Sequence, residues 1–520
     1  MGLGGGRAGV SWRNRKKMVI LWDMKRVLVI TYYWPPTGGS GVQRWVKFAK
    51  YLPALGWEPV IYTPQNPEMT AVDRTLEKEI SPDLEVIKRP IAEPYNLYRK
   101  LMGKGAETDL KKLAAGVRAC EERAEGLTER GVAGQGGAKE AAGSRDEVTP
   151  ISSGKKSWKQ RLGLWVRANV FVPDPRVTWV KPSVRFLKKY LKEHPVDAIV
   201  TTGPPQSMHL IGQKLHEALG VPWVPDFRDP WTRMYYLKHL PLTKASWDKL
   251  LKMEQGVLDG CTAVLTCTPM VQADYAARTK TPVEMITNGF DVKDFEIPRQ
   301  ARNDSGVGQN FSLTESDKTF STFSGEKVLV RGGRNSFVVT HTGLLAADGN
   351  PENLWRALAN IAETDPEFKE RLQINLIGRV DKEVLESIKN AGLTPNTVLP
   401  GYLDHAATNE AQRSADILIL PLRNDPDYAI ILPGKLFEYL AARRPILGIG
   451  QTDGAMAGVL NETKSGITAE FDDIDTMQAF LQDAWKQHKA GGIPPTGGPI
   501  DKYSRESTAR QLAALLDKIS

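Results

Sequence analysis

Short apolar runs alternate with amphipathic stretches along most of this 520-residue chain, and this alternation constrains the possible folds strongly. Runs such as residues 27–31 and 198–202 are followed by stretches with helical periodicity, residues 42–55 and 206–219. Strands separated by helices of this length form parallel sheets with right-handed crossovers. The sequence therefore predicts an α/β protein built on Rossmann-like parallel sheets.

Two polar segments interrupt this rhythm and predict a division into domains. Residues 103–157 are rich in Gly, Ala, Glu, Lys and Ser, which predicts a largely disordered insertion. Residues 297–335 are polar and rich in Ser and Gly, which predicts a linker. We therefore expect an N-terminal domain over residues 24–296, a C-terminal domain over 336–500, and a helix over 501–520 that could cross back to the first domain.

Composition and the N-terminal segment indicate a globular cytoplasmic protein. Hydrophobic residues make up 41% and charged residues 25% of the chain, with a net charge of +8, which is typical of globular proteins. A membrane-spanning helix requires a run of about 18 apolar residues, and the chain contains no such run. Residues 1–23 lack a signal-peptide core of about 7–15 apolar residues, and we expect them to be a disordered or non-native extension. Three cysteines cannot form a disulfide framework and suit a reducing compartment.

A glycine-rich turn follows the first expected strand. Gly38, Gly39 and Ser40 open the next helix, whose free N–H groups could contact a phosphate. A dinucleotide fingerprint would need a third glycine where Arg44 stands, and an acidic residue after the second strand. NAD binding is therefore disfavoured, whereas a phosphate contact and a tight turn without a ligand both stay open.

A second candidate site begins at Gly434, where a helix over residues 434–442 follows the strand at 417–420. Lys435 and Glu438 are three residues apart, so they share one face near the helix N-terminus. Helix amides and an ammonium group can hold a diphosphate, and a carboxylate can hold sugar or ribose hydroxyls. The alternative is a surface ion pair worth about 0.2–0.5 kcal/mol.

This helix resembles the signature of GT-B glycosyltransferases of family 4 (the glycosyl transferase group 1 type), which take part in bacterial surface-polysaccharide biosynthesis. Other segments are similar to further family elements, and they follow in the family's order: Tyr33-Trp34-Pro35-Pro36, Asp226-Phe227-Arg228-Asp229-Pro230-Trp231, Asn288-Gly289-Phe290-Asp291, Thr340-His341-Thr342-Gly343 and Gly401-Tyr402. The resemblance extends from Met24 to Ser520, apart from the insertion and the linker.

The resemblance implies a GT-B fold, in which two Rossmann-like domains face each other across a cleft. It also implies a retaining, hexosyltransferase-type enzyme that moves a sugar from a nucleotide-diphosphate donor to a glycan or lipid-linked acceptor. No cofactor besides the donor is expected. Two alternatives remain: a nucleotide-sugar epimerase of the same fold, and a catalytically degenerate scaffold protein.

The family pattern implies candidate residues for donor binding. Glu438 matches the family's distal glutamate, which holds the ribose, whereas the proximal position is Ile430, with Asp427 near enough to substitute. The family's Arg/Lys pair has no counterpart after Gly343, so Lys435, or less directly Arg379, could supply the positive charge. The predicted donor-binding set is Gly38, Gly39, Ser40, His341, Thr342, Gly343, Arg379, Tyr402, Asp427, Gly434, Lys435, Leu436 and Glu438.

Asp229, Arg228 and Lys435 are the predicted catalytic residues. Lys435 would stabilise the departing diphosphate, and Arg228 and Asp229 would border the acceptor. The alternative for Arg228 and Asp229 is a buried structural ion pair. Asp425-Pro426-Asp427 has the D-x-D pattern of a metal site, but GT-B enzymes usually need no metal, and none is predicted.

Two basic segments raise the possibility of contact with the inner face of the plasma membrane. They are Tyr98-Arg99-Lys100 and residues 155–167, where Trp and Leu are mixed with Lys and Arg as in an interfacial helix. The alternative is that Trp158, Leu162 and Trp165 pack into the core. Nucleic-acid binding is disfavoured, because the basic residues are dispersed and no binding motif is present.

Overall fold

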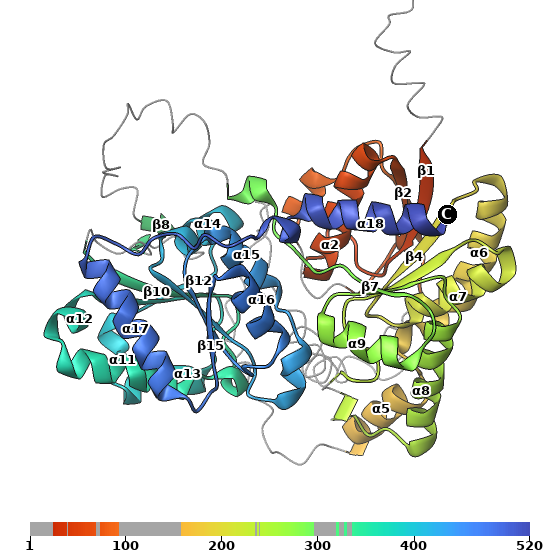
Figure 1. Cartoon of the computed structure of the whole chain (residues 1–520). Coiled ribbons are helices and arrows are strands. Elements are labelled where there is room, and N and C mark those ends of the chain that lie inside the picture. The colour runs from red at the N-terminus through yellow and green to blue at the C-terminus, as the bar shows by residue number, and fades with distance from the viewer. Residues whose placement is uncertain are drawn as a thin grey trace, which may run out of the picture.

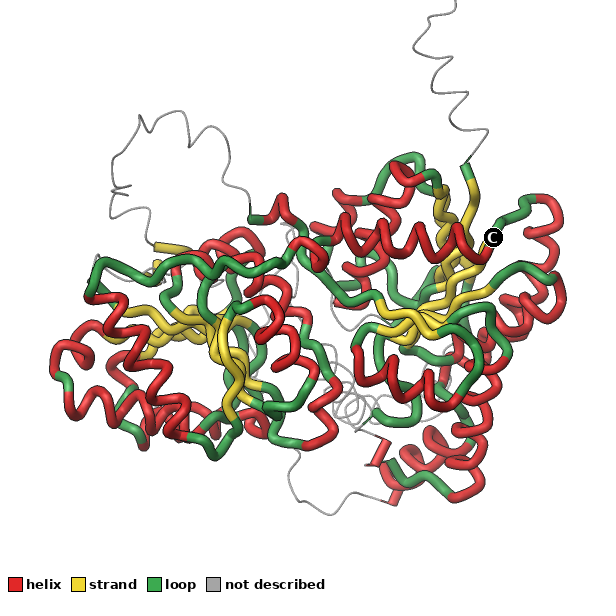
Figure 2. Tube along the Cα trace, viewed as in Figure 1, coloured by secondary structure: helices red, strands yellow, loops and turns green. Residues whose placement is uncertain are grey.

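Two parallel β-sheets with helices on both faces make up most of the molecule (Figures 1 and 2). The computed structural model describes residues 24–38, 40–68, 73–92, 158–234, 237–238, 240–295, 319–321, 327–329 and 335–520. The predicted extension over 1–23 and the predicted insertion over 103–157 lie outside these residues. The sheets confirm the predicted α/β fold with two Rossmann-like domains.

The first sheet has seven parallel strands in the order β3-β2-β1-β4-β5-β6-β7. The strand order changes direction between β1 and β4, and ligands bind α/β sheets at such a point, outside the carboxyl ends of the strands. The strands are β1 (Lys25–Ile30), β2 (Trp57–Pro64), β3 (Glu85–Arg89), β4 (Ala198–Gly203), β5 (Trp223–Phe227), β6 (Val264–Thr266) and β7 (Val283–Met285).

Helices cover both faces of this sheet because its central strands are apolar on both sides. Leu28 and Ile30 of β1 point into one hydrophobic cluster, and Val27 and Val29 point into the opposite one. The first cluster includes side chains of α6 (Val180–Glu193), α7 (Ser207–Leu219), α8 (Lys244–Asp259) and α9 (Pro269–Arg278), and the second includes those of α2 (Ser40–Tyr51). The helix expected over 42–55 ends at Tyr51 and continues as the 3₁₀-helix η1 (Leu52–Leu55), which contains Pro53.

The second sheet has six parallel strands in the order β12-β11-β10-β13-β14-β15. Its strand order changes direction between β10 and β13. The strands are β10 (Phe337–Thr342), β11 (Leu372–Ile377), β12 (Thr397–Gly401), β13 (Ile417–Pro421), β14 (Ile446–Ile449) and β15 (Gly466–Ala469). The segment predicted as a linker, residues 297–335, contains a small antiparallel pair, β8 (Thr319–Ser321) and β9 (Lys327–Leu329).

Two hydrophobic clusters also flank the second sheet. One cluster joins the sheet to α11 (Glu352–Thr364), α12 (Pro366–Arg371), α13 (Lys382–Asn390) and α17 (Ile474–Lys489). The other joins it to α15 (Gly434–Ala442) and α16 (Ala455–Thr463), and α14 (His405–Ser414) packs beside Ile377 at the end of β11. This packing holds the first turn of α15 at the carboxyl end of β10.

The C-terminal helix α18 (Arg505–Ile519) lies against the first domain, as the blue helix in Figure 1 shows. Its Leu512 and Leu516 belong to the same cluster as Trp45 and Trp57. At the crossing, Phe290 N donates to Tyr503 O at 3.1 Å and Arg505 N donates to Phe290 O at 2.8 Å. The predicted return of the C-terminal helix is therefore confirmed, and the two segments that connect the domains are hydrogen-bonded to each other.

Helix α5 (Trp158–Asn169) corrects one part of the sequence analysis. Leu162 is 51% exposed and Trp165 is 44% exposed, so the alternative in which both pack into the core is wrong. Leu164 is buried, and Asn169 Nδ2 at the end of the helix donates to Pro241 O of the first domain at 2.9 Å. The side chain of Trp158 and the segment Tyr98-Arg99-Lys100 lie outside the described residues. Within the described part of the chain, no helix is both long and apolar enough to cross a membrane.

Candidate active site

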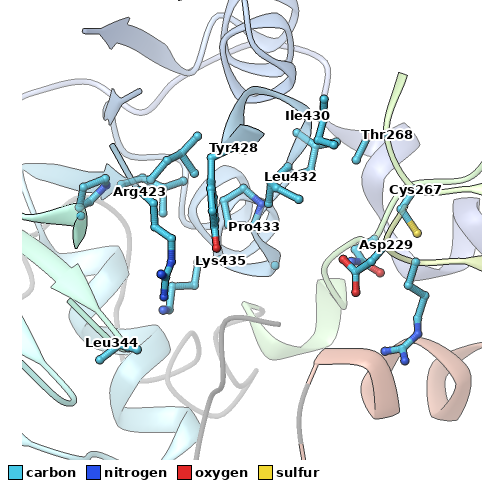
Figure 3. A pocket seen from close by; sticks show the side chains of 18 of the residues that line it. Asp229, Cys267, Thr268, Leu344, Arg423, Tyr428, Ile430, Leu432, Pro433 and Lys435 are labelled. Carbon is cyan, nitrogen blue, oxygen red and sulfur yellow. The ribbon is translucent and has the colours of Figure 1, made fainter. Parts of the chain in front are cut away.

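A pocket lies between the two domains and is lined by loops from both (Figure 3). Arg228 and Asp229 line it from the loop after β5 of the first domain. His341, Gly434 and Lys435 line it from the end of β10 and the first turn of α15 in the second domain. The pocket is thus bordered by the carboxyl ends of both sheets, where ligands of α/β folds bind.

Lys435 is a buried cation in this pocket, with 8% of its surface exposed. Its Nζ lies against Gly343, where a β-carbon would be 1.9 Å from it. Gly343 also has a φ of 98°, so glycine is needed there both for the backbone and for the lysine. Burial lowers the pKa of Lys435 to about 8, and the nearby charge of Glu438 offsets part of this effect. Among the described residues, no carboxylate forms an ion pair with it.

His341 presents a neutral imidazole to the same pocket. Its Nδ1 lies 3.1 Å from the carbonyl oxygen of Ile419, so Nδ1 carries the proton and donates to that carbonyl. Burial, with a smaller effect of Lys435, lowers the pKa of His341 to about 4. Its Nε2 is buried and has no hydrogen-bond partner within the described chain. This atom is therefore free to accept a hydrogen bond from a ligand.

Glu438 lies one helical turn after Lys435 but lines a different pocket, near the crossing of the two connecting segments. Its Oε2 accepts a hydrogen bond from Gln412 Nε2 at 3.3 Å. The sequence placed Lys435 and Glu438 on one face of α15. In the structure, the two side chains open into two separate pockets.

Asp226, in β5, forms hydrogen bonds that hold the start of the loop carrying Arg228 and Asp229. Its carboxylate accepts hydrogen bonds from Arg44 Nη2 at 3.1 Å, Trp45 Nε1 at 2.8 Å and Thr202 Oγ1 at 3.1 Å. Both Arg44 and Asp226 are completely buried. The structural ion pair of this motif is therefore Arg44–Asp226, which the sequence analysis did not identify. The sequence did contain one indication of this ion pair, because Arg44 is a charged residue on the otherwise apolar face of α2.

Arg228 lies across the start of α2. Its Nε donates to Gly203 O at 3.2 Å and its Nη2 donates to Pro204 O at 2.6 Å. A β-carbon on Gly41 would lie 1.3 Å from Arg228 Nη1, so only glycine leaves room for the guanidinium. The guanidinium and the helix N-terminus together make this edge of the cleft positive.

Asp229 points into the pocket, opposite Lys435 in Figure 3. No side chain or backbone N–H of the described residues forms a hydrogen bond or ion pair with its carboxylate. Burial raises the pKa of Asp229 to about 6, although the charge of Arg228 acts in the opposite direction. Such a carboxylate changes its charge close to neutral pH and has free capacity to accept a hydroxyl proton in a hydrogen bond.

The other predicted donor residues occupy varied positions. Gly38 is buried before α2, Ser40 is the first residue of α2, and Gly39 lies outside the described residues. Thr342 and Leu436 are buried in the second domain, where Thr342 N donates to Tyr439 Oη at 2.9 Å. Gly38, Thr342 and Leu436 do not line the pocket beside Lys435.

Arg379 and Tyr402 also lie away from both pockets. Arg379 Nη2 forms a half-exposed ion pair with Asp381 Oδ1 at 3.0 Å. Tyr402, at the start of the loop before α14, is half-exposed. In the structure, the positive charges of the second domain in this pocket belong to Lys435 and Arg423. The sequence analysis missed Arg423 because this residue is not part of any motif identified there.

The loop containing Asp427 and Ile430 contacts the first domain. Asp427 forms an ion pair with Lys238 of the first domain, and Asp425 accepts a hydrogen bond from Asp427 N at 2.9 Å. Ile430 packs against the first-domain cluster and lines the pocket. Within the described residues, no group of three His, Cys, Asp or Glu side chains could hold a metal ion.

Three solved structures have the same overall fold as this chain. A glycosyltransferase from Rickettsia africae is 12% identical, with a TM-score of 0.52 and coverage of 96% of this chain and 99% of that one. A trehalose-6-phosphate synthase is 12% identical, with a TM-score of 0.53 and coverage of 95% and 99%. A sucrose-phosphate synthase from Thermosynechococcus elongatus is 13% identical, with a TM-score of 0.50 and coverage of 95% and 94%.

Sequence comparison gives a narrower match. No curated protein sequence matches the chain. Residues 336–486, which contain the whole second sheet, match the family described as "Glycosyl transferases group 1". The chain therefore has the GT-B fold, and its second domain is similar to the group 1 glycosyl transferases.

Proposed function

We propose that this protein is a retaining, hexosyltransferase-type glycosyltransferase that uses a nucleotide-diphosphate sugar as its donor. The observation that carries the proposal is Lys435, a buried ammonium without a carboxylate partner among the described residues, facing an interdomain pocket. Because a buried charge is costly unless it is paired, a site of this kind favours an anionic ligand. The likeness of the second domain to the group 1 glycosyl transferases supports the same conclusion.

The diphosphate of the donor would lie at the N-terminus of α15. Gly434 begins this helix, so its first N–H groups are free to donate to phosphate oxygens. Lys435 Nζ would supply positive charge there. The sugar would then face Asp229 and Arg228 across the pocket.

The transfer would break the bond between the anomeric carbon and the phosphate oxygen, and form one between the same carbon and the acceptor oxygen. Positive charge develops on the sugar and negative charge on the departing diphosphate. Lys435 and the helix amides would stabilise the diphosphate. The acceptor proton would pass to the departing phosphate oxygen on the same face of the sugar, which retains the configuration. Asp229 would hold the acceptor hydroxyl in line.

The acceptor is proposed to be a glycan or a lipid-linked sugar of cell-surface polysaccharide synthesis, at the inner face of the membrane. Helix α5 supports this location, because it exposes Leu162 and Trp165 next to the basic residue Arg161. Binding to anionic vesicles that weakens with salt is expected. A Leu162→Ser, Trp165→Ser variant that sediments with vesicles as the unchanged protein does would contradict the membrane contact.

A panel of UDP-, GDP- and dTDP-sugars tests the enzymatic proposal. Nucleotide release that increases when acceptor is added supports a transferase. Isomerisation of the donor without an acceptor would identify an epimerase instead. If no nucleotide sugar binds at all, the proposed reaction is wrong and a scaffold role takes its place.

A further inference from the structure

The pocket between the domains has an apolar wall between its charged groups. This wall consists of Ile430, Leu432 and Pro433, on the loop that leads into α15. In Figure 3, Leu432 and Pro433 lie between Lys435 and Asp229, with Ile430 above them. The space in which the sugar of the donor would lie is therefore bordered by aliphatic side chains of the second domain.

Packing on both sides holds the apolar wall in place. Ile430 packs against the hydrophobic cluster of the first domain that contains Val271, which also lines the pocket. Leu432 is 8% exposed and belongs to the cluster of the second domain that contains Leu436. Because each of the two side chains is packed against a domain core, a ligand that fills the pocket meets aliphatic carbon at this position.

Hydroxyl groups of a sugar find few acceptors in this pocket. Asp229 is the one carboxylate among the described residues that line it, and the proposed reaction uses Asp229 for the acceptor. His341 Nε2 can accept one further hydroxyl proton, whereas Arg423 and Lys435 can only donate hydrogen bonds. A hydroxyl buried against carbon without a partner costs free energy, whereas a C–H or methyl group gains free energy by leaving water.

We propose that the donor is a nucleotide-diphosphate deoxysugar, which carries hydrogen or a methyl group where it meets Ile430 and Leu432. This inference rests on the proposed function and names the class of sugar that is transferred. Ile430 would determine the specificity, because its side chain is held between the two domains and faces the pocket from the side of the sugar.

Donors that lack single hydroxyl groups test the class of sugar. The series consists of nucleotide-diphosphate glucose and its four analogues that each lack one hydroxyl, prepared with UDP, GDP and dTDP. Calorimetry measures their dissociation constants. Loss of one particular hydroxyl should tighten binding about 10–100-fold, because an apolar pocket discriminates against one added hydroxyl to about this extent. If the loss of every hydroxyl weakens binding or leaves it unchanged, the inference is wrong.

Ile430→Glu tests whether this side chain causes the preference. The variant introduces the residue of the family pattern, whose carboxylate can accept the hydroxyl proton. At the same sugar position, the preference should therefore shift toward the hydroxylated donor by at least about tenfold. Ala429→Glu is the matched control, because Ala429 is the preceding, half-buried residue and does not line the pocket. No shift in Ile430→Glu, or an equal shift in Ala429→Glu, would overturn the inference.

The ratio of two dissociation constants separates sugar recognition from a general disturbance. A variant that merely moves the domains apart weakens all donors equally and leaves the ratio unchanged, and this result would contradict the inference. Ile430→Thr is the second variant, should the melting temperature show that Ile430→Glu does not fold. Threonine keeps the branched shape that packs against the first domain and adds one hydroxyl, so the same ratio should shift in the same direction by a smaller factor. Should neither variant fold, the series on the unchanged protein decides.

The same measurements keep this inference distinct from the proposed function. If nucleotide sugars bind but glucose with all its hydroxyls binds most tightly, only the class of sugar is wrong. If no nucleotide sugar binds to the unchanged protein, the proposed function itself is wrong.

Discussion

Lys435 Nζ packs directly against Gly343. A β-carbon at position 343 would lie only 1.9 Å from this nitrogen, so any residue other than glycine would collide with it. The lysine belongs to α15 and the glycine to the loop after β10, so two elements far apart in the sequence must fit together at this point. The fit leaves the ammonium buried at the mouth of the helix, next to the interdomain pocket.

Gly343→Ala is expected to displace Lys435 and to lower donor affinity and transfer rate at least about tenfold, because two atoms cannot share this space. Steady-state kinetics and calorimetry measure the effect. Gly392→Ala is the matched control, because Gly392 also has a positive φ, of 71°, but nothing lies within 4 Å of its β-carbon position. Both variants place an alanine at a positive φ, so the control also includes backbone strain. Equal activity in the two would show that Lys435 does not need its present position.

Lys435→Met is expected to reduce transfer about 10²–10³-fold, as when a group that stabilises developing negative charge is removed. In the unchanged protein, kcat/KM should fall as the pH rises through about 8, where Lys435 loses its proton. The residual activity of the variant should lack this decline. Lys382→Met, at an exposed position on α13, is the control. A decline through pH 8 in Lys435→Met that matches the unchanged protein would contradict the assignment.

Asp229→Asn should remove the acidic limb of the pH profile. Because the pKa of Asp229 is about 6, kcat/KM of the unchanged protein should fall as the pH drops through that value. Stability should change in the opposite direction. A carboxyl whose folded-state pKa is raised contributes its stability below the unfolded value of 3.8 and loses it as the pH rises to about 6.

At pH 8, the melting temperature of Asp229→Asn should therefore be higher than that of the unchanged protein. Near pH 4, the two melting temperatures should differ little. Asp248→Asn, at an exposed position on α8, controls for the loss of one charge. An unchanged acidic limb in Asp229→Asn would remove this residue from the active site.

Arg44→Met should destabilise the first domain by about 3–5 kcal/mol, because it leaves the buried Asp226 carboxylate without its charged partner. Chemical denaturation followed by the tryptophan fluorescence of that domain would measure this. Arg44→Met combined with Asp226→Asn should recover part of the loss. If Arg44→Met alone were as stable as the unchanged protein, the ion pair would contribute no net stability.

Local patterning was sufficient to predict much of the fold. The apolar runs of the central strands are buried on both faces, and the helix at Gly434–Ala442 begins after a loop that contains a proline, as its sequence indicated. Periodicity reports which side of an element is apolar, and this property depends on neighbouring residues alone. Lys435 could be identified in the same way, from its place in the first turn of that helix.

Local sequence patterns could not predict contacts between segments that are distant in the sequence. Arg44 and Asp226 are 182 positions apart. Asp427, which was predicted to replace the missing proximal glutamate in donor binding, forms an ion pair with Lys238 of the other domain. The burial of Arg505 could not be predicted from the sequence either, because a basic residue at the start of a helix is usually exposed. The sequence thus determined the two sheets and the helix whose first turn contains Lys435. Only the tertiary structure decided which charges are neutralised and which remain unpaired, because burial and pairing depend on segments that meet when the domains fold together.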